Sequence, residues 1–338
     1  MTISGSLLVP VALLAAAVIS AVITRAIRPM LLRHALARPN ARSSHRIPTP
    51  QGAGIAVIAA TLLVAGTIME YAGMTDMKLP VAVFAAALFI AIVGFVDDVK
   101  PIGVPPRLLL QAIAVGAIVF TASGDVRIVA ACPLWLERTL LLLAGLWFVN
   151  LVNFMDGLDW MTVAEVVPIT AALVMLGWLG ELPVSATLIA AALCGAMLGF
   201  APFNRPVAKI FLGDVGSLPI GLLLGWCLLQ LAYDKQFAAT LLLPLYYLAD
   251  ATVTLLRRMA RREPFWAAHR SHFYQRATDN GYTVWRVIGE VFILNIVLAI
   301  LAIGSIMAPS AAIEILLLIA GGAATALVMY RFSQPRAA

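Results

Sequence analysis

Long uncharged apolar runs recur along the whole chain and constrain its fold more than any other feature. The segment LPVAVFAAALFIAIVGFV, which ends at Val96, carries no charged residue. It is long enough to cross the ~30 Å hydrocarbon core of a bilayer, where backbone polar groups must bond to one another within helices. Of the 338 residues, 62% are hydrophobic and 12% charged, whereas a soluble domain is about one half apolar and one quarter charged. The sequence therefore predicts an all-α polytopic integral membrane protein.

Eleven such runs can be delimited, with no linker or low-complexity segment between them. They span approximately residues 6–24, 53–73, 79–96, 107–123, 139–155, 161–179, 184–203, 216–233, 237–256, 287–307 and 312–330. We therefore expect a single integral membrane domain over residues 1–338, with ten or eleven transmembrane helices. The first run lacks a basic leader and a small-residue cleavage site, which favours a retained helix over a signal peptide.

Basic residues fall mainly on one side of the predicted bundle. If the runs alternate in direction, one side carries the loops 25–52, 97–106, 156–160, 204–215 and 257–286 and the C-terminal tail. If Arg107 at the mouth of the run 107–123 is counted there, all but four of the 23 Lys and Arg residues lie on that side, the exceptions being Lys78, Arg127, Arg138 and Lys235. Positive residues favour the cytoplasm, so we expect a periplasmic N-terminus, a cytoplasmic C-terminus and a bacterial inner-membrane location. The net charge of +6 is thus attributed to anionic membrane lipids rather than to nucleic acid.

Acidic residues gather at predicted helix ends on this cytoplasmic side. They are Asp97, Asp98, Asp156, Asp159 and Asp214, with the amides Asn150 and Asn153 nearby. Clustered carboxylates repel each other unless a cation neutralises them, and oxygen ligands without His or Cys suit Mg²⁺. Such an ion bridges phosphate oxygens and stabilises a leaving phosphate. Ordinary solvation of helix ends is the alternative, and it explains five acids in three loops less well.

Two neighbouring motifs support a site for anionic groups. In FLGDVGSLPIG, Gly216 and Ser217 begin a helix whose free N–H groups could face an anion, with a tight interhelical turn as the alternative. In NLVNFMDGLDW, a spacing of three places Asn150, Asn153 and Asp156 on one helix face. Amides at membrane depth indicate either function or hydrogen bonds between helices.

The last predicted cytoplasmic loop is rich in basic residues. Its first arginines, up to Arg262, are best explained by anionic lipid headgroups. The following HRSHFYQR segment places His269, Arg270, His272 and Arg276 within two helical turns. Arg and His donors at this spacing suit a pyrophosphate better than a transition metal, for which a third ligand is not evident.

With these motifs in this order, about residues 40–280 resemble the polyprenyl-phosphate N-acetylhexosamine-1-phosphate transferase family. Its members include the MurNAc-pentapeptide translocase of peptidoglycan synthesis and the GlcNAc-1-phosphate transferases of O-antigen and teichoic acid synthesis. The resemblance implies transfer of a sugar 1-phosphate from a UDP-N-acetylhexosamine to undecaprenyl phosphate, with release of UMP. It also implies Mg²⁺ as cofactor, with Mn²⁺ as a substitute. A homodimer is left open.

The resemblance assigns roles around the acidic motifs. Asp97 and Asp98 match the adjacent catalytic aspartates of a DDxxK-type motif, with Asp97 as candidate base toward the lipid phosphate and Lys100 as a phosphate contact. Asn153 and Asp214 match positions associated with Mg²⁺, and Asp214 is also grouped with the catalytic residues. Direct attack by the lipid phosphate is the preferred path, with an aspartyl-phosphate intermediate as the alternative.

Other matches concern the donor, and two departures concern its identity. The implied donor-binding residues are Asn150, Asp156, Asp159, His269, Arg270 and His272. Trp160 stands where many relatives have Gly, and HRSHFYQR replaces the triple-histidine run typical of the peptidoglycan enzyme. The second departure resembles the branch that initiates lipopolysaccharide O-antigen with N-acetylfucosamine, N-acetylquinovosamine or a similar sugar.

Competing hypotheses come from inside and outside this family. An ion-coupled transporter also uses intramembrane acids, but it predicts acids near the midplane and repeats with broken helices. Within the family, the peptidoglycan translocase is the alternative. Asp250, near the end of the run 237–256, has no assigned role and is expected either to face the site or to pair with an arginine.

Overall fold

The computed structural model describes residues 3–37, 48–73, 78–264, 269–308 and 310–336. Its helices are α1 (Ile3–His34), α2 (Gly54–Tyr71), α3 (Lys78–Val99), α4 (Val104–Thr121), α5 (Leu134–Met155), α6 (Met161–Trp178), α7 (Val184–Asn204), α8 (Asp214–Tyr233), α9 (Phe237–Leu242), α10 (Leu245–Ala260), α11 (Phe273–Asp279), α12 (Val284–Met307) and α13 (Ala311–Ser333). Two short antiparallel strands, β1 (Leu36–Ala37) and β2 (Thr49–Pro50), join α1 to α2. The predicted all-α class is confirmed.

The predicted membrane spans correspond to helices with one exception. In the part of the chain that the structure describes, ten helices are long and apolar enough to cross a membrane. The run 237–256 is divided into α9, with 6 residues, and α10, with 16. Pro244 precedes α10 and has no N–H to continue the hydrogen bonding of a single helix. The prediction of one continuous helix over this run is therefore wrong.

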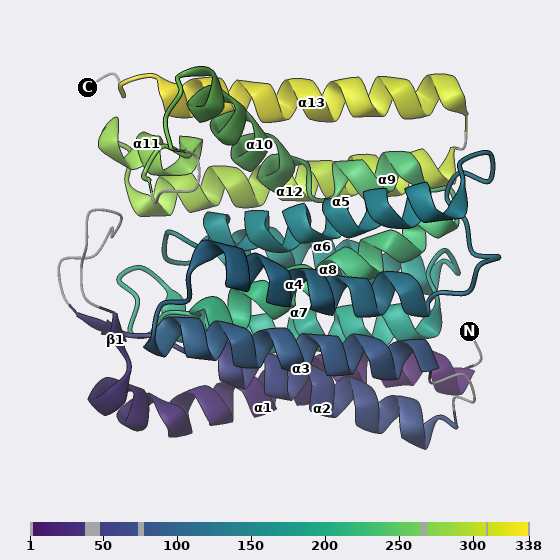
Figure 1. The fold of residues 1–338 in the computed structure, drawn as a ribbon, viewed down its shortest axis with the longest axis horizontal. Coiled ribbons are helices and arrows are strands. Elements are labelled where there is room, and N and C mark those ends of the chain that lie inside the picture. The colour runs from purple at the N-terminus through teal and green to yellow at the C-terminus, as the bar shows by residue number, and fades with distance from the viewer. Residues whose placement is uncertain (1–2, 38–47, 74–77, 265–268, 309, 337–338) are drawn as a thin grey trace.

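The helices form a bundle whose interior consists of α6, α7 and α8 (Figure 1). Their apolar windows are 78%, 83% and 89% buried, against 17% for α13. Apolar side chains at the periphery, such as those of Leu316 and Ile319, are exposed in the bundle and match a surrounding of lipid. The interior therefore fixes the relative positions of the helix ends.

One end of the bundle collects the polar segments. Figure 1 shows the last turns of α3, α5, α10 and α13 and the first turns of α4, α6, α8 and α12 at its left end. We call this the site end. The start of α1 lies at the opposite end of the bundle from the close of α13 (Figure 1).

A glycine sets the distance between α3 and α8 at the site end. A Cβ atom at Gly94 would lie 2.3 Å from the carbonyl oxygen of Asp214, so a larger residue would require one helix to move. The backbones of α3 and α8 can therefore approach closely where both helices carry aspartates.

Candidate active site

Asp98 holds the beginning of α8. Its Oδ1 accepts a hydrogen bond from the backbone N–H of Asp214 (3.0 Å) and its Oδ2 accepts one from that of Val215 (3.1 Å). These N–H groups belong to the first turn of α8 and have no partner within the helix. Gln51 donates its side-chain N–H to the carbonyl oxygen of Asp98 at 3.1 Å. Asp98 thereby fixes the position from which the Asp214 side chain projects.

Asp97 faces Asp214 and is held by the loop that follows it. Its Oδ2 forms an ion pair with Arg107 at 2.9 Å, and its Oδ1 accepts from the N–H of Ile102 at 2.5 Å. The carboxyl groups of Asp97 and Asp214 lie within hydrogen-bonding distance of each other. Sequence reasoning counted Arg107 only as a charge at a helix mouth. Its contact with Asp97 depends on the return of the chain through VKPIGVPPR, for which sequence spacing gives no signal.

Asn153 completes this group from a third helix. Its amide donates to Asp214 Oδ1 at 2.7 Å and to the hydroxyl of Ser217 at 2.9 Å. The structure thus brings Asp97, Asp98, Asn153 and Asp214 together from α3, α5 and α8, and we call these four residues the carboxylate cluster. Ser217 was seen only as a helix-start residue in the GDVGS motif.

The chemistry of the carboxylate cluster suits a hard divalent cation. Within the described residues, no group of three or more His, Cys, Asp or Glu side chains is arranged to hold a metal ion. Because both carboxylate oxygens of Asp98 accept N–H groups of α8, the cluster offers a cation the carboxylates of Asp97 and Asp214 and the amide of Asn153. Two carboxylates that face each other must share a proton or a cation. Mg²⁺ takes only a few oxygen ligands from a protein, and water and substrate phosphates complete its coordination.

The other two predicted aspartates organise the α5–α6 loop. Asp156 accepts a hydrogen bond from the hydroxyl of Thr162. Burial, together with the negative charges of Asp98 and Asp159, raises the pKa of Asp156 to about 7, against the lowering effect of the hydrogen bond from Thr162. Asp159 Oδ2 accepts from the backbone N–H of Ala208 at 3.0 Å, which ties this loop to the segment before α8.

Two predicted residues have surroundings different from the cluster. Asn150 is buried and donates to Gln111 Oε1 of α4 at 2.6 Å and to the carbonyl of Leu146 at 2.8 Å. For Asn150, this geometry matches the structural alternative given for amides at membrane depth, a hydrogen bond between helices. Lys100 follows α3 and is exposed; its backbone N–H donates to the carbonyl oxygen of Val96, and its side chain forms no hydrogen bond or ion pair with any residue in the described ranges.

Asp250 anchors the basic loop. It is completely buried, and its carboxylate lies 3.0 Å from Nδ1 of His272. It also accepts the backbone N–H groups of Phe273 and Tyr274, which begin α11, at 3.1 and 3.2 Å. Of the two alternatives for Asp250, pairing with an arginine is therefore wrong: the partner is a histidine of the predicted donor-binding segment.

Tyr274 connects the basic loop to the end of α5. Its hydroxyl donates to the carbonyl oxygen of Phe154 at 3.1 Å, one residue after Asn153. A Cβ atom at Gly157 would lie 2.2 Å from this hydroxyl oxygen, so the glycine makes room for it. Burial raises the pKa of Tyr274 well above its usual value, which keeps the hydroxyl protonated as a donor.

The remaining basic residues lie beside His272. The ring of His269 is centred 4.9 Å from that of His272, and its Nδ1 lies 2.9 Å from the hydroxyl of Ser271. Arg270 donates to Thr278 at 2.9 Å and pairs with Asp279 at 3.2 Å. The HRSHFYQR segment is therefore an ordered basic surface attached to α10 and α5.

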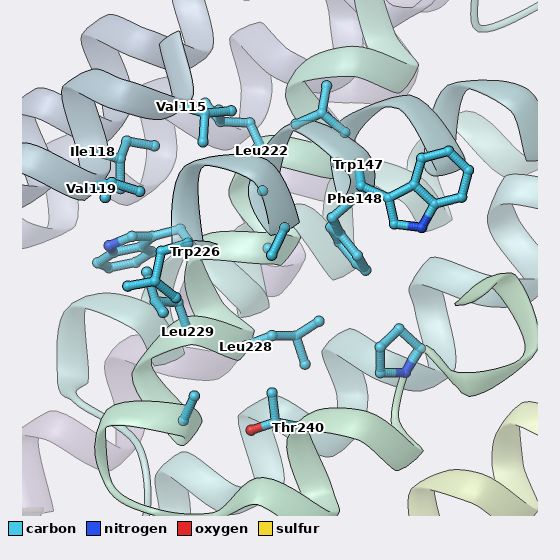
Figure 2. A pocket seen from close by; sticks show the side chains of 18 of the residues that line it. Val115, Ile118, Val119, Trp147, Phe148, Leu222, Trp226, Leu228, Leu229 and Thr240 are labelled. Atoms are coloured by element: carbon cyan, nitrogen blue, oxygen red, sulfur yellow. The ribbon is translucent and has the colours of Figure 1, made fainter. Parts of the chain in front are cut away.

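An apolar cavity lies among α4, α5, α8, α9 and α10 (Figure 2). Its volume is ≈ 280 Å³. Figure 2 shows Val115, Trp147, Phe148, Leu222 and Trp226 around it, and its lining is almost entirely hydrocarbon. Such a cavity suits an aliphatic chain rather than a nucleotide.

Comparisons with known proteins agree with this arrangement. The model of the glycosyl transferase family 4 matches residues 80–232. A phospho-N-acetylmuramoyl-pentapeptide-transferase of Streptococcus pneumoniae is 26% identical over 62% of this chain and 67% of its own length. One of the same description from Streptococcus gordonii is 28% identical over 61% and 67%. A probable undecaprenyl-phosphate N-acetylglucosaminyl 1-phosphate transferase of Bacillus subtilis is 27% identical over 80% and 76%.

The matched region runs from α3 to α8 and contains every residue of the carboxylate cluster. Its relatives transfer phosphorylated sugars, which disfavours the transport hypothesis. The chain is a multi-pass membrane protein, and these matches support the polyprenyl-phosphate hexosamine-1-phosphate transferase family.

Proposed function

We propose that this enzyme transfers N-acetylhexosamine 1-phosphate from a UDP-sugar to undecaprenyl phosphate and releases UMP. The observation that carries the proposal is the convergence of Asp97, Asn153 and Asp214 from three helices at one end of a membrane bundle. Undecaprenyl phosphate stays in the bilayer and a UDP-sugar stays in water, so the reaction requires a site at the membrane surface. We place the site end in the cytoplasm of a bacterial inner membrane because most basic residues lie there.

In this reaction an oxygen of the lipid phosphate attacks the sugar-linked phosphorus. The bond from that phosphorus to the bridging oxygen breaks, and the oxygen leaves with UMP. Asp97 accepts a proton from the lipid phosphate where it carries one, and Arg107 orients Asp97 for this role. A Mg²⁺ ion held by Asp214 and Asn153 would neutralise charge on the diphosphate. Asp98 positions Asp214 through its hydrogen bonds to α8.

The two substrates meet the site from different sides. The basic surface of His269, Arg270 and His272 supplies donors for the diphosphate of the nucleotide sugar, and the α5–α6 loop with Asp156 adjoins it through Tyr274. The polyprenyl chain lies against the apolar cavity of Figure 2. Burial of its methylene groups, each worth about 0.8 kcal/mol, holds the acceptor at the site.

We propose a UDP-N-acetylhexosamine as donor rather than UDP-MurNAc-pentapeptide, and initiation of O-antigen or a related envelope glycan as the role. The HRSHFYQR segment supports this choice, and so does the larger share of the chain that matches the Bacillus subtilis relative. The test is incubation of purified protein with undecaprenyl phosphate, Mg²⁺ and single UDP-sugars while UMP is measured. UMP release that requires both the lipid and an N-acetylhexosamine donor is expected. Turnover only with UDP-MurNAc-pentapeptide would overturn the donor assignment.

A further inference from the structure

A groove between α10 and α13 has apolar walls and a basic mouth. Its volume is ≈ 740 Å³. Figure 1 shows α10 inclined between α13 and α12 near the site end. Leu245, Ala249 and Val253 line it from α10, and Ala326 and Met329 line it from α13. The groove therefore presents hydrocarbon along the depth of the membrane.

Three arginines surround the mouth of this groove: Arg257, Arg261 and Arg276. Within the described ranges, none of them has a carboxylate within the 4.0 Å of an ion pair. The guanidinium groups of Arg257 and Arg276 lie 4.6 and 6.0 Å from the ring centre of buried Phe273, which holds them in place. Three positive charges without a carboxylate in ion-pair contact thus meet at the end of an apolar groove, while Glu263 in the adjoining recess pairs with Arg258.

A buried hydroxyl in the groove wall also lacks a partner. Thr325 of α13 is 2% exposed, and its Oγ1 has no hydrogen-bond partner among the described residues. Buried hydroxyls normally find one, so this atom offers a contact to a polar group of a ligand. Ser333 and Gln334 stand at the mouth and add polar side chains.

We propose that the groove binds one anionic glycerophospholipid, with its phosphodiester at the three arginines and an acyl chain between α10 and α13. Arginines that only orient a protein reach the headgroup layer separately, whereas these converge on one apolar recess. The lining comes from α10, α11 and α13 and from the residues directly after α10 and α13, and none of α3, α5 or α8 takes part. A phosphate held there is therefore not at the carboxylate cluster, and the proposal is independent of the proposed function.

The test measures lipid binding to purified protein by native mass spectrometry with phosphatidylglycerol and phosphatidylcholine. Tight binding of one phosphatidylglycerol is expected, and each of Arg257→Gln, Arg261→Gln and Arg276→Gln weakens it about fivefold. Phosphatidylcholine binding stays unchanged. Arg331→Gln is the matched control, because Arg331 also lies near the end of α13 but pairs with Glu290 and does not line the groove.

A steric variant separates binding from folding. A Cβ atom at Gly322 meets no atom within 4 Å, so the side chain of Gly322→Leu begins in open space at the groove wall and is expected to occupy the groove. It is expected to reduce bound phosphatidylglycerol at least tenfold while the melting temperature in lipid-free detergent stays unchanged. The proposal would be overturned by equal affinity for both phospholipids or by full competition from inorganic phosphate. It would also be overturned if undecaprenyl phosphate displaced phosphatidylglycerol one for one, or if a second copy of the chain could be cross-linked over Gly322.

Discussion

Asp250 Oδ1 and His272 Nδ1 lie 3.0 Å apart, and both side chains are buried. A carboxylate accepts, so Nδ1 of the histidine carries the proton and Nε2 is left as the nitrogen free to act. The same carboxylate holds the first two N–H groups of α11. One acid of α10 thus fixes both the orientation of His272 and the start of the helix that follows it.

Replacement of Asp250 should therefore impair the reaction through His272. Asp250→Asn keeps the size of the side chain but leaves fewer acceptors for the donors around it. Each buried donor left unsatisfied costs about 1–3 kcal/mol. We expect kcat to fall about 10- to 100-fold, with a smaller change in the KM for the lipid, measured as UMP release from protein in lipid nanodiscs.

The matched control is Asp234→Asn, because Asp234 is an exposed acid at the opposite end of the bundle. It should retain normal turnover. Circular dichroism and melting temperature show whether Asp250→Asn is folded. A folded Asp250→Asn protein with normal kcat would contradict the positioning role.

The adjacent aspartates should respond differently to substitution. Asp97→Asn removes the ion pair with Arg107 and the proposed base, so we expect a lower rate with nucleotide binding largely retained. Asp98→Ala removes the acceptor of the first N–H groups of α8, which costs about 0.5–2 kcal/mol as the loss of an N-terminal cap does.

Thermal unfolding and turnover of the two variants distinguish these roles. Asp98→Ala should have the lower melting temperature, whereas Asp97→Asn should unfold close to the parent protein. Isothermal titration with the UDP-sugar measures the retained binding. The reverse order of melting temperatures would contradict the assignment of Asp98 to positioning.

Much of this arrangement is predictable because the membrane restricts the possible structures. Uncharged runs must be helices, and alternating direction places Asp97, Asn153 and Asp214 at the same end. The pairing of Asp250 with His272 is less accessible, since it joins residues across a loop whose path depends on tertiary contacts. The division at Pro244 was missed because the hydrophobicity of the run continues across it.

Trp160 stands at a position where the family resemblance implies glycine, and its backbone and contacts explain how a tryptophan is accommodated. Its φ is 60°, in the left-handed region where glycine is favoured, which accounts for the Gly expected at this position. The tryptophan is held there by a bond from its N–H to Asn204 Oδ1 (2.8 Å) and from its indole N–H to the carbonyl of Ala201 (2.6 Å). Its ring also meets that of Trp285 at 5.4 Å. Tertiary contacts therefore offset a local backbone preference.

Close packing of α3 on α8 gives a second structural prediction. Gly94→Ala places a Cβ atom 2.3 Å from the carbonyl oxygen of Asp214, so the helices must separate. Overpacking of this kind costs about 1–3 kcal/mol. We expect a lower melting temperature and at least a tenfold loss of turnover, because the displaced helix carries Asp214.

Gly289→Ala is the control for this substitution. A Cβ atom at Gly289 meets no atom within 4 Å, and alanine favours helix α12. Its melting temperature should equal or exceed that of the parent protein. Unchanged activity in Gly94→Ala would show that the contact between the helices is not needed for the site.

Removal of the proposed Mg²⁺ ligands tests the carboxylate cluster directly. Asp214→Ala should abolish turnover, a loss of at least about 10³-fold in kcat, because no other carboxylate projects from the first turn of α8. Asn153→Ala removes a weaker ligand and the hydrogen bond to Asp214, so about 10- to 100-fold more Mg²⁺ should be needed for half-maximal UMP release. Excess Mg²⁺ should restore Asn153→Ala but not Asp214→Ala, and chelation with EDTA should stop the parent enzyme.

Asn150→Ala is the control, since Asn150 pairs with Gln111 away from the cluster and should keep the parental Mg²⁺ requirement. An enzyme that still turns over in EDTA, or an Asp214→Ala variant with near-normal kcat, would exclude metal binding by these residues as the basis of the reaction.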